Sequence, residues 1–154
     1  MTEIRERTIR GLKSGDQFVV SRTLTEKDTR LFADLTRDYN PVHFDDRFAA
    51  AKNLTGRICH GLLVAGLVTE VGGQIGWLAT GLDIRFRRPV YFGDTVTCTF
   101  TVTEVGENDQ AAARVDCTNQ KGAVVMEAEI RGFLPGPVER RIMAETVRSP
   151  DSRR

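Results

Sequence analysis

The sequence lacks several features that mark specialised protein classes. Only three cysteines occur in 154 residues, with no even set and no CxxC pair, which argues against a disulfide framework or a cysteine metal centre. Basic and acidic residues nearly cancel, 22 against 21, so no overall charge attracts nucleic acid or an anionic membrane. Residues 1–17 are polar and contain no apolar signal-like stretch. We therefore expect a cytoplasmic protein without nucleic-acid or membrane partners.

The longest apolar run, residues 62–79, is interrupted by Glu70, Gln74 and several glycines. These interruptions favour a buried helix over a membrane span. Small or apolar residues occupy nearly every position from 61 to 78, so the sequence predicts a long helix there, buried on almost all sides. Five glycines weaken its intrinsic helicity by about 1 kcal/mol each, and tertiary packing must compensate.

Shorter elements are expected before this helix. A strand is predicted over 17–24, and a second helix begins where Thr25-Glu26-Lys27-Asp28 matches a capping box. The pair Asn40-Pro41 ends that helix near Asp38, because proline disfavours the helical conformation of the residue before it. A short helix over 48–51, capped by Asp45 or Asp46, follows.

After Gly81 the apolar residues alternate with polar ones, which is typical of strands. The alternating segments cover 82–86, 96–102, 113–117 and 124–133. The sequence thus predicts one α+β domain over 1–134, with an antiparallel sheet of about five strands and one long central helix. Residues 135–154 are rich in proline and arginine without clear periodicity, and are expected to be a partly disordered C-terminal extension whose last six residues are mobile.

Two groups of residues are suited to proton chemistry. Asp38 lies at a helix end, and His43 follows it beyond a proline-stiffened turn. A carboxylate and an imidazole that share a water can move a proton and a hydroxyl. His60-Gly61 opens the long helix, where the free N–H of Gly61 is a candidate donor to a carbonyl oxygen that gains negative charge.

The run Thr36-Arg37-Asp38-Tyr39-Asn40-Pro41-Val42-His43-Phe44-Asp45 resembles the signature of the MaoC-like, (R)-specific enoyl-CoA hydratase family. The resemblance continues through 56–63 and 86–96, and covers roughly 16–133. Arg37 departs from the pattern, because glycine is usual there. The family fold is the hot-dog, a curved antiparallel sheet wrapped around one long helix, which agrees with the elements predicted above.

The resemblance implies a function and roles for individual residues. Asp38 and His43 would hold the water that adds to a trans-2-enoyl thioester, or that leaves an (R)-3-hydroxyacyl thioester. The Gly61 amide would bind the thioester oxygen, and Thr69 stands where the family has a supporting hydroxyl. Asn40 and His60 complete the candidate substrate-binding set. No metal and no redox cofactor is expected, and the acyl group would arrive on coenzyme A or an acyl carrier protein. A homodimer or higher homo-oligomer is implied.

Several alternatives stay open from the sequence. Hot-dog thioesterases have an acid nine residues after the histidine of His-Gly, whereas here Thr69 is ninth and Glu70 is tenth. A non-catalytic acyl-thioester-binding domain is a further alternative. Cys59 beside His60 is expected to be a buried apolar residue rather than a nucleophile. Arg85, Arg87 and Arg88 are either a solvated strand face or contacts for coenzyme A phosphates.

Overall fold

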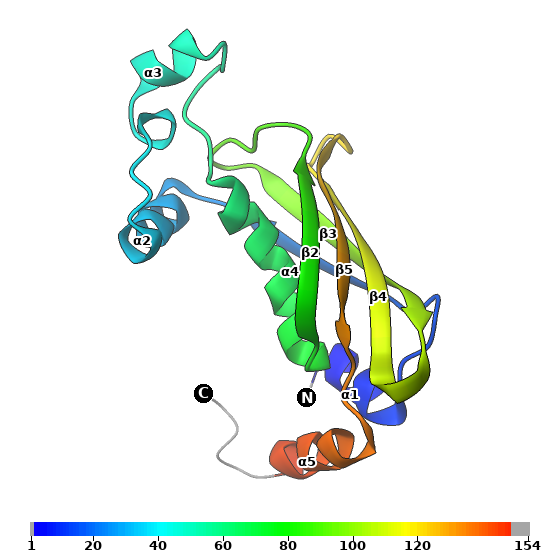
Figure 1. The fold of residues 1–154 in the computed structure, drawn as a ribbon. Helices are drawn as coiled ribbons and strands as arrows, with labels where there is room; N and C mark the ends of the chain where they lie inside the picture. Colours follow the sequence, from blue (N-terminus) through cyan, green and yellow to red (C-terminus); the bar gives the residue numbers. More distant parts are fainter. Residues whose placement is uncertain (1, 149–154) are drawn as a thin grey trace.

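The computed structural model describes residues 2–148, in which helix α4 (Gly61–Ile75) lies along one face of a curved antiparallel sheet (Figure 1). The strands are β1 (Gln17–Thr23), β2 (Leu78–Phe86), β3 (Thr95–Val105), β4 (Gln110–Thr118) and β5 (Val124–Phe133). Their order in the sheet is β1-β3-β4-β5-β2, which leaves β1 and β2 as the two edges. The predicted α+β arrangement of five strands and one long helix is confirmed.

The core lies between α4 and the sheet. On β3 the residues Val96, Cys98, Phe100 and Val102 are almost completely buried and alternate with partly exposed threonines. On α4 the buried residues recur at helical spacing, at Val64, Leu67, Val68, Val71 and Ile75. Full burial of each such side chain stabilises the fold by about 1.5–3 kcal/mol, which offsets the poor helicity of a glycine-rich helix.

Helix α4 is shorter than the sequence predicts, and only one of its sides is buried. Gly76 adopts a left-handed conformation (φ 76°) and ends the helix, and Leu78 already pairs with Phe133 as the first residue of β2. The prediction of a helix to 78 and of a strand only after Gly81 was therefore wrong. In the single chain Leu62 is 61% exposed and Glu70 is exposed, so burial on nearly all sides was wrong as well.

Strand β2 is also largely uncovered. Its apolar residues Leu78, Leu82 and Phe86 are 67%, 55% and 52% exposed, although the alternation over 82–86 predicted a buried face for Leu82 and Phe86. Only Ile84 is partly buried against the core. The edge of β2 and the open side of α4 together form an apolar surface that a single chain leaves exposed.

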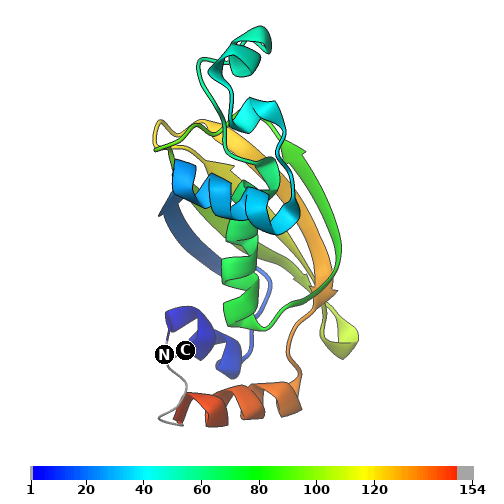
Figure 2. The ribbon, with the colours of Figure 1, turned by 90° about the vertical axis from the view of Figure 1, so that its left-hand side faces the viewer.

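Two short helices and a 3-10 turn surround the N-terminal end of α4. Helix α2 (Glu26–Thr36) crosses this end of α4 in Figure 2, and the turn η1 (Pro41–His43) and helix α3 (Asp46–Ala51) follow. The capping box at Thr25 is confirmed, since Thr25 and Asp28 exchange side-chain to backbone hydrogen bonds. Asp45 is the residue that caps α3.

The sequence analysis missed two terminal helices, α1 (Glu3–Arg10) and α5 (Pro137–Arg148), which contact each other at the opposite end of the molecule from α2 (Figure 1). Arg5 from α1 donates from Nε to the carbonyl oxygen of Gln74, at 2.7 Å, and so caps the end of α4. Residues 137–148 are thus helical. The six residues predicted to be mobile, 149–154, lie outside the described residues.

The described part of the chain contains no helix that is both long enough and apolar enough to cross a membrane. Helix α4 is its most apolar helix and has only 15 residues, several fewer than the roughly 20 that a span requires.

Candidate active site

A left-handed residue starts the turn that carries Asp38. Arg37 ends α2 with φ 60° and ψ 25°, and its N–H donates to the carbonyl oxygen of Ala33. Glycine is the residue that best tolerates this conformation, which explains why glycine is usual at this position of the MaoC-like signature. Arg37 adopts the same turn although it is not glycine, and its left-handed conformation is strained.

Asn40 shapes the next part of the turn. Its side-chain oxygen accepts from the N–H of Val42 at 3.2 Å, and its own N–H donates to a carboxylate oxygen of Asp38 at 3.2 Å. These bonds orient the Asp38 carboxylate and start η1. Within the described residues, the structure thus places Asn40 in the turn that positions Asp38.

His43, at the end of η1, is held in one tautomer. Its side chain is buried, and Nδ1 lies 2.8 Å from the carbonyl oxygen of Ile58. Because a carbonyl oxygen can only accept, Nδ1 carries the proton and Nε2 keeps a free lone pair. Burial lowers the pKa of His43 below its ordinary value, against the opposing effects of the Ile58 carbonyl and Asp38. Near neutral pH, His43 is therefore a neutral imidazole with Nε2 ready to accept a proton.

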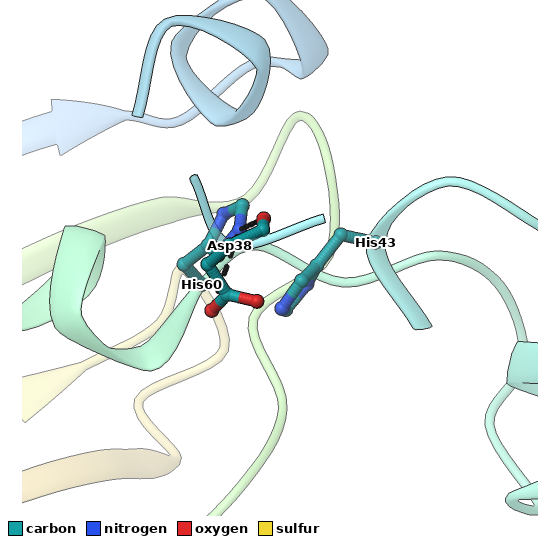
Figure 3. A group of neighbouring side chains, drawn as sticks. All are labelled: Asp38, His43 and His60. Atoms are coloured by element: carbon teal, nitrogen blue, oxygen red, sulfur yellow. Dashed lines mark hydrogen bonds and ion pairs between the residues drawn. The ribbon is translucent and has the colours of Figure 1, made fainter. Parts of the chain in front are cut away.

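His60 connects these elements to α4. It is the residue before the helix, is 2% exposed, and donates from Nε2 to the backbone carbonyl oxygen of Asp38 at 2.9 Å (Figure 3). Its ring stacks on that of His43, with centroids 3.7 Å apart and planes at 30°. His60 Nδ1 is buried without a hydrogen-bond partner among the described residues. His60 thus supports both Asp38 and His43.

Asp38 and His43 face each other across a gap suited to one water. One side-chain atom each of Asp38, His43 and His60 lies within 4.8 Å of the others, and Figure 3 shows an Asp38 carboxylate oxygen directed toward a ring nitrogen of His43. A carboxylate oxygen and a ring nitrogen less than 4.8 Å apart can both form a hydrogen bond of about 2.8 Å to one bridging water. The Asp38 side chain is 50% exposed, so this water is accessible from solvent.

Gly61 offers an N–H beside this pair. As the first residue of α4 it has no partner for its N–H within the helix, and the helix dipole adds positive potential there. A Cβ at position 61 would lie only 2.8 Å from the outer end of the Phe86 ring, so any side chain there would have to displace this half-exposed ring. Phe86 thus occupies part of the space beside the Gly61 N–H.

A pocket of about 390 Å³ joins His43 to Gly61, whereas Asp38 and His60 are not among its lining residues. His43, Gly61 and Phe86 line it, together with Ile58, Val64, Pro89 and Val125 on the apolar side. Arg87 and Arg88 line it as well. A mainly apolar pocket of this volume with a few convergent polar groups is typical of small-molecule sites. We call it the acyl pocket below.

The three side chains Asp38, His43 and His60 are also the kind that binds a transition metal. However, His60 Nε2 carries the proton that it donates to Asp38, and His43 Nδ1 carries the one that it donates to Ile58. An ion bound through His60 Nε2 would have to break the first of these bonds. The absence of a metal stays a prediction from the sequence.

Thr69 and Glu70 lie apart from the acyl pocket. Both are exposed on α4; the Thr69 hydroxyl donates to the carbonyl oxygen of Gly66 at 2.6 Å, and Glu70 lies 3.8 Å from Arg22 in an ion pair. Neither lines the acyl pocket. The role of Thr69 stays a prediction from the resemblance.

The thiol of Cys59 is not ionised at neutral pH. Burial raises its pKa to about 11, so almost no nucleophilic thiolate exists at neutral pH. Cys59 is therefore a buried residue rather than a nucleophile, as the sequence analysis expected, and the structure adds that it lines the acyl pocket.

The three arginines differ from one another. Arg85 pairs with Asp83 at 3.4 Å and Arg87 pairs with Glu127 at 2.6 Å, as expected for a solvated strand face. Arg88 forms no ion pair within the described residues and donates to the carbonyl oxygen of Val124 at 2.7 Å.

Two parts of the site were missed by sequence reasoning. The Ile58 carbonyl sets the His43 tautomer, and no sequence pattern marks a backbone carbonyl for such a role. Phe86 was predicted only as a strand residue, because its contact with Gly61 depends on how β2 crosses α4.

Comparisons with known proteins agree on one family. The model of the MaoC like domain matches residues 12–125. An (R)-specific enoyl-CoA hydratase from Rhodospirillum rubrum is 36% identical over 129 residues, which cover 80% of this chain and 89% of that protein. A 3-hydroxybutyryl-CoA dehydratase from Methylorubrum extorquens is 32% identical over 88% of both chains.

A similar structure has also been solved. The (R)-hydratase from Aeromonas caviae involved in PHA biosynthesis superposes with a TM-score of 0.76 at 31% identity, over 82% of this chain and 99% of that one. Asp38, His43, His60 and Gly61 all lie within the residues 12–125 that the family model matches.

Proposed function

The chain belongs to the MaoC-like family, and from this premise we propose that Asp38 and His43 hold and activate the water of an (R)-specific enoyl-thioester hydratase. The protein is a hydro-lyase that adds water to a trans-2-enoyl-CoA, or removes it from the (R)-3-hydroxyacyl thioester. The observation that carries the roles of the residues is the free Nε2 of His43 beside the Asp38 carboxylate.

In hydration, the water oxygen bonds to carbon 3 while His43 Nε2 accepts one of its protons. The Asp38 carboxylate orients the water by accepting its other hydrogen. Carbon 2 then receives a proton from the pair, so that one water is added overall. The reverse sequence removes water. A positioned acid and base of this kind contributes about 10²–10⁴ in rate.

As the water attacks, negative charge develops on the thioester oxygen. The Gly61 N–H, which has no hydrogen-bond partner among the described residues, is placed at the start of α4 to donate to that oxygen. One such donor contributes about 10²–10³ in rate. His60 and Asn40 act as positioning residues, since each bonds to Asp38 rather than to the acyl pocket.

The direct test is an assay with crotonyl-CoA that follows loss of the enoyl absorbance and release of free thiol. Hydration with an (R)-3-hydroxy product supports the proposal. Thiol release without hydration would instead identify a thioesterase, although Glu70, the acid nearest to the thioesterase position, lies outside the acyl pocket.

We further propose a homodimer and a cytoplasmic location, with no metal and no redox cofactor. The dimer is supported by the apolar surface formed by the β2 edge and the open side of α4, where Leu62 and Leu82 are more than half exposed. The acyl carrier is addressed in the next subsection.

A further inference from the structure

A second, smaller hollow adjoins the acyl pocket. Its volume is about 200 Å³, and Arg88, Pro89, Tyr91, Asp94, Gln120 and Lys121 are among its lining residues. Arg88 and Pro89 line both cavities, so the outer hollow lies next to the acyl pocket. A chain that passes from Gly61 out of the acyl pocket past Pro89 reaches this outer hollow.

Two cations in the outer hollow have no acidic partner. Arg88 and Lys121 are exposed and form no ion pair within the described residues. Arg88 is anchored by one donor to the Val124 carbonyl, which leaves other N–H groups of its guanidinium available. Arg87, next in sequence, differs because Glu127 already neutralises it.

The acid in the outer hollow is already engaged. One carboxylate oxygen of Asp94 accepts from Gln120 Nε2 at 2.6 Å, and the other accepts from the N–H of Tyr91 at 2.9 Å. Gln120 also accepts from the N–H of Thr95. These bonds fix the β4–β5 turn that carries Lys121 against the start of β3. The net charge of the hollow is positive by one.

We propose that Arg88 and Lys121 form a phosphate subsite for the carrier of the acyl thioester, and that this phosphate belongs to the nucleotide part of coenzyme A. The inference rests on the proposed function, because it places the thioester at Gly61. Arginine and lysine are the side chains that bind phosphate best. A hollow with only two free cations fits a compact phosphate group, whereas an acidic protein face would need a wider basic surface.

The test compares two crotonyl thioesters in steady-state hydration. Crotonyl-CoA carries the nucleotide phosphates, and crotonyl-pantetheine carries none. For the variant Arg88→Ala/Lys121→Ala we expect KM for crotonyl-CoA to rise about tenfold, and by clearly more than KM for crotonyl-pantetheine, because Arg88 also lines the acyl pocket. Lys121→Ala, whose side chain lines only the outer hollow, should raise KM for crotonyl-CoA and leave kcat and KM for crotonyl-pantetheine unchanged. The KM difference should shrink at high salt, because exposed charges are screened.

The control is Arg85→Ala. It removes an arginine side chain too, but Arg85 lies on β2, pairs with Asp83 and lines neither cavity. We expect it to leave both KM values unchanged. Lys121→Glu is the second variant, since this exposed turn position tolerates the change without loss of folding, and it should raise KM for crotonyl-CoA further. Turnover of crotonyl-pantetheine reports folding within the same experiment.

The outcomes separate the two proposals. If the wild-type protein hydrates neither thioester, the proposed function fails. If it hydrates both and the double variant changes both KM values equally, or changes neither, the phosphate subsite is overturned. A third arm uses crotonyl thioester on an acyl carrier protein: a KM increase confined to that substrate would overturn the assignment to coenzyme A.

Discussion

The imidazole of His60 lies flat against the imidazole of His43, with ring centroids 3.7 Å apart. Two stacked imidazoles at this distance cannot both carry a positive charge at low energetic cost, and both are buried. The contact therefore helps to keep His43 neutral, in addition to the effect of burial.

The first prediction concerns pH. Since burial holds the pKa of His43 below its ordinary value of 6.5, kcat/KM for hydration should be flat near neutrality and fall only below about pH 6.5. His60→Gln removes the like-charge neighbour, so the pKa of His43 should rise and the acid limb should move to higher pH. A pH profile of crotonyl-CoA hydration for both proteins measures this. An unchanged midpoint would contradict the coupling.

Stability should follow pH with the same sign. The unfolded chain binds a proton at His43 more readily than the folded chain does, because the folded pKa is depressed. The free energy of unfolding should therefore fall as pH drops through the ordinary histidine range and on through the folded pKa. Urea unfolding at a series of pH values measures this contribution of His43 to the free energy of unfolding. His43→Gln is the control, because it lacks the titrating group and should show a weaker pH dependence.

The second prediction concerns the catalytic pair. Asp38→Asn and His43→Ala should each lower kcat at least about 100-fold, since each removes one of the groups that handle the water and its proton. Asp83→Asn is the control, because Asp83 is an exposed acid that pairs only with Arg85 in the described structure. Circular dichroism verifies folding. Full turnover by either purified variant would remove the assigned role.

The third prediction concerns Gly61. Gly61→Ala brings a methyl group to 2.8 Å from the outer end of the half-exposed Phe86 ring, and should destabilise the fold by about 1 kcal/mol, the low end for overpacking, and lower kcat/KM. Gly56→Ala is the control, because nothing lies within 4 Å of a Cβ there. In the double variant Gly61→Ala/Phe86→Ala the clash disappears. Its thermal unfolding should recover most of the lost stability, and strictly additive losses would refute the clash.

The fourth prediction concerns Arg37. Because it adopts a left-handed conformation, Arg37→Gly should be more stable than Arg37→Ala by about 1 kcal/mol. The alanine variant removes the same side chain and keeps the strain, so the difference isolates the backbone. Chemical denaturation measures both. Equal stabilities would show that position 37 carries no strain.

The fifth prediction concerns assembly. Light scattering should give a mass of about two chains, and Leu62→Arg, on the open side of α4, should lower it toward one chain. Val138→Arg is a matched control, since Val138 is 57% exposed on α5 at the other end of the molecule. A monomeric wild-type protein, or equal dissociation by both variants, would exclude this interface.

Much of the fold could be predicted because its signals are local. The alternation of Cys98 and Phe100 with threonines predicted β3, and the capping-box pattern of Thr25 and Asp28 predicted the start of α2, where the structure shows the reciprocal bonds. Helices α1 and α5 were missed because they are polar and dock on other elements rather than supply a periodic core face. The exposure of Leu82 was missed because alternation does not distinguish an edge strand from a central one.

The candidate site was predictable to a similar extent. The sequence places Asp38 and His43 on either side of one turn, and the structure brings them together at the start of α4. The stacking of His60 on His43 and the position of Lys121 beside Arg88 depend on contacts between segments far apart in sequence. Such contacts leave no local pattern.

The bond from His43 to the carbonyl oxygen of Ile58 has an evolutionary consequence. That acceptor belongs to the main chain, so no point mutation at position 58 that preserves the backbone path can delete it. Substitutions in the acyl pocket, including at Ile58, can therefore change its shape and adapt it to shorter or bulkier acyl groups. Such substitutions leave the His43 tautomer unchanged, and with it the free Nε2 that receives the proton.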